Sequence, residues 1–167
     1  LPFADSSFDA VVSTFGVMFT PNQDKAASEM ARVCRRGGKI GRANWTPEGF
    51  IGHLFKVVGR HVPPPAGVPP AARWGQDDYV RQLFGSEASD IRTARQMFTM
   101  RYRSPEHWLQ VFRTWYGPVH KAFAALPADA ALALEADILD LIRTFNRSGD
   151  ATMVVPAEYL EVVVVKR

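Results

Sequence analysis

Two short apolar runs near the start of the chain predict β-strands. Residues 8–14 (Phe-Asp-Ala-Val-Val-Ser-Thr) are rich in β-branched residues and apolar on both faces, which is typical of a buried parallel strand. Residues 39–45 predict a second strand, and an amphipathic stretch lies between the two runs. A strand, a helix and a strand joined by short links predict a right-handed parallel crossover unit.

The amphipathic stretch predicts one helix. Thr20, Pro21 and Gln23 supply a capping hydroxyl, a proline for the first helical position and a glutamine at the capping-box position. One face of the helix then carries apolar residues spaced four and three apart, namely Ala26, Met30 and Val33. We expect Gly37-Gly38 to end this helix, because glycine readily adopts the backbone conformation that closes helices.

The remainder of the chain predicts mainly helices, at residues 49–61, at residues 76–84, from Ser104 onward and at residues 129–145. The helix that starts at Ser104 is expected to bury Trp108, Leu109, Phe112 and Trp115. Residues 62–72 hold five of the twelve prolines and predict an extended loop. Two further stretches predict strands, at residues 91–103 and 159–165.

The composition is that of an ordinary globular protein. Of 167 residues, 47% are hydrophobic and 22% are charged. The net charge is +3, and the basic residues are scattered along the chain. The isoelectric point of about 9.2 comes without a basic stripe that alternates with aromatic residues, so we expect no nucleic-acid partner. No run reaches the roughly 18 apolar residues of a membrane span. The lone Cys34 excludes an internal disulfide and fits a reducing compartment, so we expect a cytoplasmic protein without a membrane partner.

Three motifs in the first quarter of the chain carry a resemblance to a known family. They are Leu-Pro-Phe at residues 1–3, Phe-Asp-Ala-Val at residues 8–11, and Arg-Val-Cys-Arg-Arg-Gly-Gly at residues 32–38. Together they resemble the second half of the Rossmann-like class I S-adenosylmethionine-dependent methyltransferases, in particular the branch of ubiquinone and menaquinone biosynthesis. Cys34 and Arg36 stand where that family commonly has a leucine and a proline, which affects packing and the rigidity of the turn.

The resemblance implies an α/β fold with a part of that family's sheet. Strands four to seven would lie at residues 8–14, 39–45, 91–103 and 159–166. In the family the last strand is antiparallel and is inserted between strands five and six. The resemblance therefore implies a partial Rossmann-like sheet, with a helical insertion before its last strand.

The same resemblance implies three regions along the chain. Residues 1–103 would form the C-terminal half of the Rossmann-like core, residues 104–150 a helical cap, and residues 151–167 the final strand that returns to the core sheet. The glycine-rich loop that holds the cofactor in this family would lie upstream of Leu1. We therefore expect the chain to be part of a longer enzyme, and to bind the cofactor weakly or not at all when isolated.

The carboxyl ends of the strands are the expected ligand site, because ligands of open parallel sheets bind there. The resemblance implies S-adenosyl-L-methionine as the cofactor, with candidate binding residues Leu1, Ser13, Thr14, Phe15 and Gly16. Candidate substrate-binding residues are Trp45, Thr46, Tyr116 and His120, the last two in the cap. Gly16 equally suits a simple turn, and Trp45 equally suits core packing.

The chemistry implied by the resemblance does not require a distinctive catalytic residue. Methyl transfer is an in-line displacement at a sulfonium carbon, so alignment and desolvation supply much of the rate. A general base is needed only when the acceptor carries a proton that must leave, and the sequence shows no catalytic residue. His53 and His61 have no acidic or cysteine partner at ligand spacing, so we expect no metal site. The methyl acceptor is expected to be a small molecule, and the apolar cap favours an apolar or aromatic one.

A non-catalytic α/β interaction domain derived from a methyltransferase is the alternative interpretation. In both interpretations the strand at residues 8–14 would form an apolar sheet edge, because its neighbour in the family lies upstream. Exposed strand edges pair readily with other chains. The sequence therefore predicts a homo-oligomer, most simply a two-fold dimer.

Overall fold

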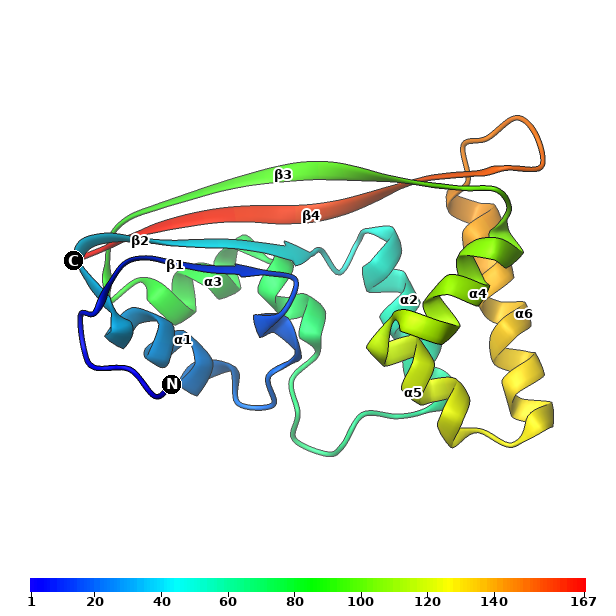
Figure 1. Ribbon diagram of the computed structural model, residues 1–167, viewed down its shortest axis with the longest axis horizontal. Helices are drawn as coiled ribbons and strands as arrows, with labels where there is room; N and C mark the ends of the chain where they lie inside the picture. The colour runs from blue at the N-terminus through cyan, green and yellow to red at the C-terminus, as the bar shows by residue number, and fades with distance from the viewer. The chain divides into compact units, whose positions relative to one another are not determined.

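The computed structural model describes residues 1–167 and contains a mixed four-stranded sheet. In chain order the strands are β1 (Phe8–Thr14), β2 (Cys34–Trp45), β3 (Ala88–Tyr102) and β4 (Met153–Lys166). Their order in the sheet is β1-β2-β4-β3. β1 pairs with β2 in parallel, whereas β4 pairs with β2 in antiparallel orientation (Figure 1). The predicted parallel unit and the predicted insertion of the last strand are both confirmed.

Helix α1 (Gln23–Val33) connects β1 to β2, but it begins later than predicted. Asn22 caps the helix, because its side-chain Oδ1 accepts a hydrogen bond from the backbone N–H of Lys25 at 2.9 Å. The predicted cap at Thr20 is wrong. Its hydroxyl instead donates to the carbonyl of Val17 at 2.8 Å, within the 3₁₀ turn η1 (Val17–Phe19).

The two glycines do not end α1, because the chain enters β2 directly at Cys34. They lie inside β2 at an irregularity of the ladder, where Phe8 is paired with Cys34 but Ala10 with Lys39. Gly37 has φ +72°, in the left-handed region. A Cβ atom on Gly38 would lie 2.8 Å from the carbonyl oxygens of Arg35 and Asp9 and from Cys34 Sγ. The glycine pair is therefore required by a bulge within the strand.

The chain divides into two compact units. The first unit contains residues Leu1–Pro47, Gly67–Gln96 and Tyr159–Arg167. In this unit α1 and α3 (Asp77–Phe84) lie on the same side of the sheet (Figure 1). Its fully buried side chains come from strands and helices alike and include Ile40, Val80, Phe84, Val162 and Val164. The unit is thus a sheet with one helical layer and a shared apolar core.

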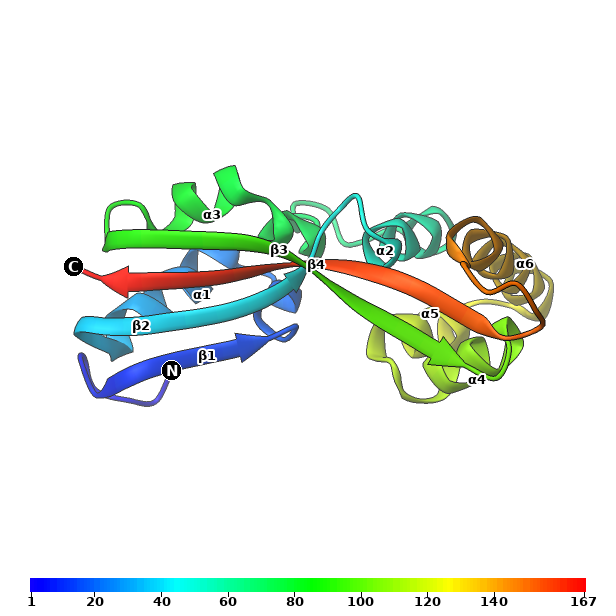
Figure 2. The same cartoon turned by 90° about the horizontal axis from the view of Figure 1, so that it is seen from above.

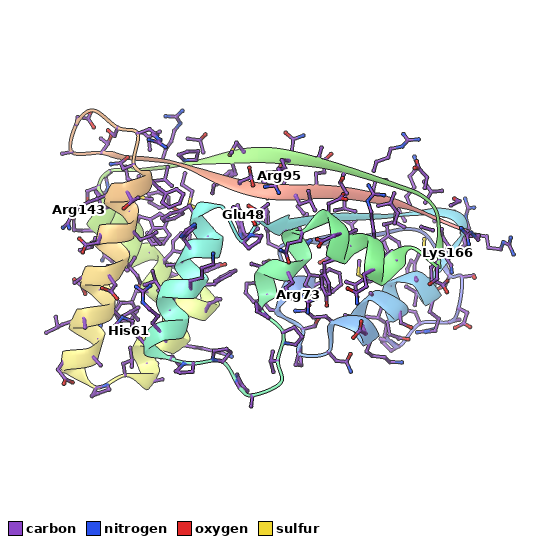
Figure 3. The ribbon with its side chains drawn as sticks, turned by 180° about the vertical axis from the view of Figure 1, so that it is seen from behind. Glu48, His61, Arg73, Arg95, Arg143 and Lys166 are labelled. Carbon is purple, nitrogen blue, oxygen red and sulfur yellow. The ribbon has the colours of Figure 1, made fainter.

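The second unit contains residues Glu48–Ala66 and Met97–Glu158. Its helices are α2 (Phe50–His61), α4 (Pro105–Trp115), α5 (Gly117–Ala125) and α6 (Ala128–Phe145). Nε2 of His61 lies 2.9 Å from Oδ2 of Asp137, which joins α2 to α6 (Figure 3). This contact, and a weaker one from Arg60, lower the pKa of Asp137. The resemblance places the helix at residues 49–61 in the core region. In the structure this helix, α2, packs with α6 in the second unit instead.

Several predictions for the later elements are confirmed and others need correction. The helix predicted from Ser104 onward is α4, and Ser104 caps it, since its hydroxyl accepts a hydrogen bond from the N–H of His107 at 3.1 Å. Trp115 was expected to be buried and is 82% exposed, because it lies at the last residue of α4. Helix α5 was not predicted at all. β3 and β4 begin earlier than expected, at Ala88 and Met153, and run in opposite directions (Figure 2).

Two shorter features complete the description of the chain. Residues 62–70 contain no helix or strand, in agreement with the predicted proline-rich loop, and the 3₁₀ turn η2 (Ala71–Gly75) follows them. No helix combines the length and the apolar character that crossing a membrane demands.

The bulge in β2 predicts that Gly38→Ala destabilises the protein. The added methyl group has no room beside two carbonyl oxygens and a sulfur atom. We expect the free energy of unfolding, measured with urea, to fall by about 1–3 kcal/mol. Gly59→Ala is the control, because nothing lies within 4 Å of a Cβ in that position of α2, and it should raise stability slightly. Equal stability of Gly38→Ala and the parent protein would contradict this account of the bulge.

Candidate functional site

The candidate site lies where β1 and β2 end at the same edge of the sheet. Beyond Thr14 the chain continues through Phe15, whose φ of +57° lies in the left-handed region. A bulky residue rarely adopts this conformation, and the strain costs on the order of 1–3 kcal/mol. The N–H of Phe15 donates to the carbonyl of Ala43 at 2.8 Å, so the parallel ladder extends by one bond and holds the strained residue in place.

An aromatic cluster forms around this strained residue. The ring of Phe15 stacks on that of Trp45, with centroids 4.1 Å apart and an angle of 21° between the planes. Tyr159 presents its ring edgewise to both, at centroid distances of 5.6 Å and 6.3 Å. Trp45 and Tyr159 are directly paired across β2 and β4. We call Phe15, Trp45 and Tyr159 the rim cluster.

The residues around Phe15 shape the turn that leaves β1. Oγ of Ser13 accepts a hydrogen bond from the N–H of Val17 at 3.0 Å and so fixes the start of η1. Gly16 has φ −94°, and a Cβ there would make only ordinary contacts, 3.7 Å from Ser13 Oγ. The turn itself therefore does not require glycine at this position. Thr14 is exposed beside Phe15.

The turn after β2 is fixed by close packing. Gly75 of η2 lies so near the carbonyl oxygen of Trp45 that a Cβ atom would not fit between them. Thr46 is fully buried, and Trp45 is 7% exposed. The structure thus brings Ser13, Thr14, Phe15, Gly16, Trp45 and Thr46 to one edge of the first unit.

Leu1 is not brought to that edge. Its carbonyl accepts a hydrogen bond from Nη2 of Arg32 at 3.1 Å, near the C-terminal end of α1. The same guanidinium contacts the carbonyl of Phe3 and the carboxylate of Asp5. Because α1 ends where β2 begins, Leu1 is held at the opposite end of the strands from Phe15.

Tyr116 and His120 lie in the second unit, beside and within α5. Nδ1 of His120 is 3.0 Å from the carbonyl oxygen of Arg113, and the ring of Tyr116 lies 4.8 Å from that of Phe112. His120 lines an open surface hollow of about 570 Å³ together with Gln110, Arg113, Thr114, Phe123 and Ala124. These two residues therefore belong to a different unit from the rim cluster, and their role in substrate binding stays a prediction.

The rim cluster offers binding surfaces rather than acid–base groups. It consists of three aromatic rings, two of them only half-buried, with the hydroxyl of Ser13 already engaged in a backbone contact. Aromatic faces favour apolar groups and cations that carry methyl groups. No group of three or more histidine, cysteine or acidic side chains is arranged to hold a metal ion.

Tyr159 is the residue of this cluster that sequence reasoning missed. It was assigned only as the first residue of a strand. A usable signal was present, because an antiparallel last strand beside residues 39–45 must place its start opposite their end. The pair Trp45 and Tyr159 follows from that pairing.

The comparisons with known proteins concern both the sequence and the fold. Residues 1–41 match the model of a family described as "Methyltransferase domain". The chain is 44% identical over 153 residues to Uncharacterized protein Rv1403c of Mycobacterium tuberculosis, a match that covers 89% of this chain and 56% of that relative. It is 30% identical over 110 residues to the demethylmenaquinone methyltransferase of Deinococcus radiodurans, with 62% of this chain and 46% of that protein covered.

A solved structure from Anabaena variabilis, provisionally named a methyltransferase of an antibiotic biosynthesis pathway, shares the fold. Its TM-score is 0.55 at 18% sequence identity, and the match covers 96% of this chain and 68% of that chain. The chain therefore shares its α/β fold with a protein that is named a methyltransferase. The chain spans little more than half the length of its Mycobacterium tuberculosis relative.

The contact of Ser13 with Val17 predicts that Ser13→Ala destabilises the turn at the rim. Removing the hydroxyl leaves the N–H of Val17 without its acceptor, so we expect a loss of about 1 kcal/mol in the free energy of unfolding. Ser7→Ala is the matched control, because Ser7 donates only to the carbonyl of Ala4 on an exposed surface, and its effect should stay within about 0.5 kcal/mol. Similar losses in both variants would show that the turn does not depend on Ser13.

Proposed function

We propose that this chain is the C-terminal part of a class I S-adenosylmethionine-dependent methyltransferase that acts on a small molecule. The observation that carries the proposal is the rim cluster at the carboxyl ends of a parallel strand pair, the usual place for ligands in such sheets. The match of residues 1–41 to the methyltransferase domain supports it, because that segment contains β1, α1 and most of β2.

Within this proposal β1, β2, β3 and β4 correspond to strands four, five, six and seven of a Rossmann-like methyltransferase sheet. The order β1-β2-β4-β3 supports the correspondence, because the last strand lies between the second and third. The antiparallel pairing of β2 with β4 supports it too. The similarity to a demethylmenaquinone methyltransferase supports assignment to the branch of quinone biosynthesis.

The rim cluster fits a cationic, methyl-bearing group. When bound, S-adenosyl-L-methionine supplies a methyl group activated by a neighbouring sulfonium charge. The half-buried ring of Phe15, stacked on the buried Trp45, presents π-electron density that would attract such a charge. With the cofactor bound there, these rings would keep water away from the methyl group and would limit how an acceptor could approach. The strained backbone of Phe15 fixes the ring before any ligand arrives, which lowers the cost of orientation.

Residues outside this chain are needed for full cofactor binding in this proposal. The chain spans 56% of the length of its Mycobacterium tuberculosis relative, and the described residues include no glycine-rich loop between a strand and a helix that could hold the cofactor. We therefore propose that another part of the full-length protein supplies that loop, and that residues 1–167 alone bind the cofactor weakly. The single buried thiol, Cys34, supports a cytoplasmic location.

Cofactor affinity of the full-length protein tests the proposal. Titration calorimetry with S-adenosyl-L-methionine should show binding, and Phe15→Leu should weaken it about 10-fold by removing the ring that stacks on Trp45. Phe98→Leu is the matched control, because Phe98 is 55% exposed on β3 and belongs to the second unit, and its loss should leave affinity unchanged. A full-length protein that binds neither S-adenosyl-L-methionine nor S-adenosylhomocysteine would refute the proposal.

One observation favours the alternative of an interaction domain. β1 is an edge strand of the sheet, and it exposes 36% of Phe8 and 70% of Val12. An apolar edge of this kind can pair with a second copy of the protein.

The oligomeric state of the full-length protein tests assembly through the β1 edge. A dimer that Val12→Lys converts to a monomer, measured by light scattering, would support assembly through the β1 edge. Gln82→Lys, on the exposed surface of α3, is the control because it adds the same positive charge. A monomeric full-length protein would remove the support for assembly, because another segment would then cover β1.

A further inference from the structure

The inner face of β2 carries two polar residues where an apolar pattern is expected. Side chains two apart on a strand share a face, so Ile40, Arg42 and Asn44 point the same way. Their partners across β4 are apolar and buried, namely Val164, Val162 and Leu160. Arg42 is only 3% exposed and Asn44 is completely buried. A cationic and an amide side chain therefore lie inside an otherwise apolar layer.

Aromatic rings surround the guanidinium group of Arg42. Its Cζ atom lies 4.6 Å from the centroid of the Trp74 ring and 4.9 Å from that of Phe84. Both rings are fully buried, on η2 and α3 respectively. Ring faces stabilise a cation by about 0.5–2 kcal/mol, which is less than the several kcal/mol that burying an unpaired ion costs. The rings alone do not balance this charge.

The edges of the guanidinium group are unsatisfied. Nε, Nη1 and Nη2 of Arg42 all lack a hydrogen-bond partner within the chain. Burial is the only influence on the pKa of Arg42, which it lowers to about 9, so the group keeps its proton at neutral pH. No acidic side chain pairs with Arg42 or contributes to its pKa.

Two further buried groups share this condition. Both amide atoms of Asn44 and Nε1 of Trp74 have no hydrogen-bond partner. The three side chains thus offer five nitrogen donors and one oxygen acceptor. Native proteins leave few buried polar atoms unpaired, and a set made almost wholly of donors around a cation calls for a negatively charged acceptor.

We propose that Arg42, Asn44 and Trp74 bind a small monovalent inorganic anion, such as chloride, between β2 and the helical layer of the first unit. A water molecule would satisfy some of the N–H groups but would leave the charge of Arg42 unbalanced. A larger, divalent anion such as phosphate would lose far more hydration on entering a layer of fully buried apolar side chains. Chloride accepts hydrogen bonds from several N–H groups and does not require them to adopt a fixed geometry.

This anion site is independent of the proposed methyl transfer. It joins β2 to η2, because Arg42 and Asn44 lie on one and Trp74 on the other. The same two elements meet where Gly75 packs against the carbonyl of Trp45. The anion therefore stabilises the junction beneath the rim, whatever ligand the rim binds.

Thermal unfolding of the full-length protein tests the site. At constant ionic strength and pH 7, replacing sodium gluconate with sodium chloride should raise Tm by several degrees and then saturate. Arg42→Met should remove this dependence, because it deletes the cation and three donors. Arg36→Met is the matched control, since Arg36 is exposed on the same strand, and it should keep the dependence. An equal chloride effect in both variants would overturn the proposal.

A second measurement does not depend on any variant. A crystal of the full-length protein grown with sodium bromide should show an anomalous peak within hydrogen-bonding distance of Arg42 and Trp74. Density for water alone at that position would overturn the proposal. An acidic side chain from another part of the full-length protein paired with Arg42 would overturn it as well.

Discussion

The parallel ladder between β1 and β2 is the interaction on which the rest of the structure depends. It runs from the pair Ala10–Lys39 to the pair Thr14–Ala43, and the N–H of Phe15 adds one more bond to the carbonyl of Ala43. The bulge at Gly37-Gly38 sets its register. A slip of one residue would turn every side chain of β2 to the opposite face. Trp45 would then leave the rim cluster, and Arg42 would face solvent.

The site and the fold are linked through the ends of these two strands. Strained backbone at Phe15 is tolerated because hydrogen bonding and ring stacking both hold it, and such strain often occurs where proteins bind ligands. At the end of β2, close packing of η2 fixes the turn that carries Trp45 and Thr46. The methyltransferase proposal needs only these positioned surfaces, since methyl transfer relies more on alignment than on acid–base groups.

The elements with a clear periodic pattern could be predicted from the sequence, and so could the direction of the first two strands. Errors arose where two local options compete. The hydroxyl of Thr20 bonds backward to Val17 instead of capping α1, and Gly37-Gly38 serves a bulge instead of a helix end. Helix α5 is short and begins with Gly117-Pro118, a pair that equally suits a turn. Trp115 shows that apolar spacing does not identify which residue of a last turn meets solvent.

The candidate site could also be predicted only in part. Residues that follow β1 and β2 along the chain were found from strand order, whereas Tyr159 and Arg42 required knowledge of pairing between distant segments. Leu1, which the resemblance places among the cofactor-binding residues, does not lie with the others at this edge. Its position is set by hydrogen bonds to Arg32.

The place of β4 in the sheet has a consequence for biosynthesis. This strand lies between β2 and β3, although the ribosome makes it after both of them. Until its fourteen residues emerge, one whole side of β2 has no hydrogen-bonding neighbour, and the valines that complete the core are missing. Nascent chains that expose an unpaired strand edge and apolar surface aggregate readily. Molecular chaperones, or slow translation of the preceding segment, would therefore matter more to the yield of this protein than to one whose sheet closes in chain order.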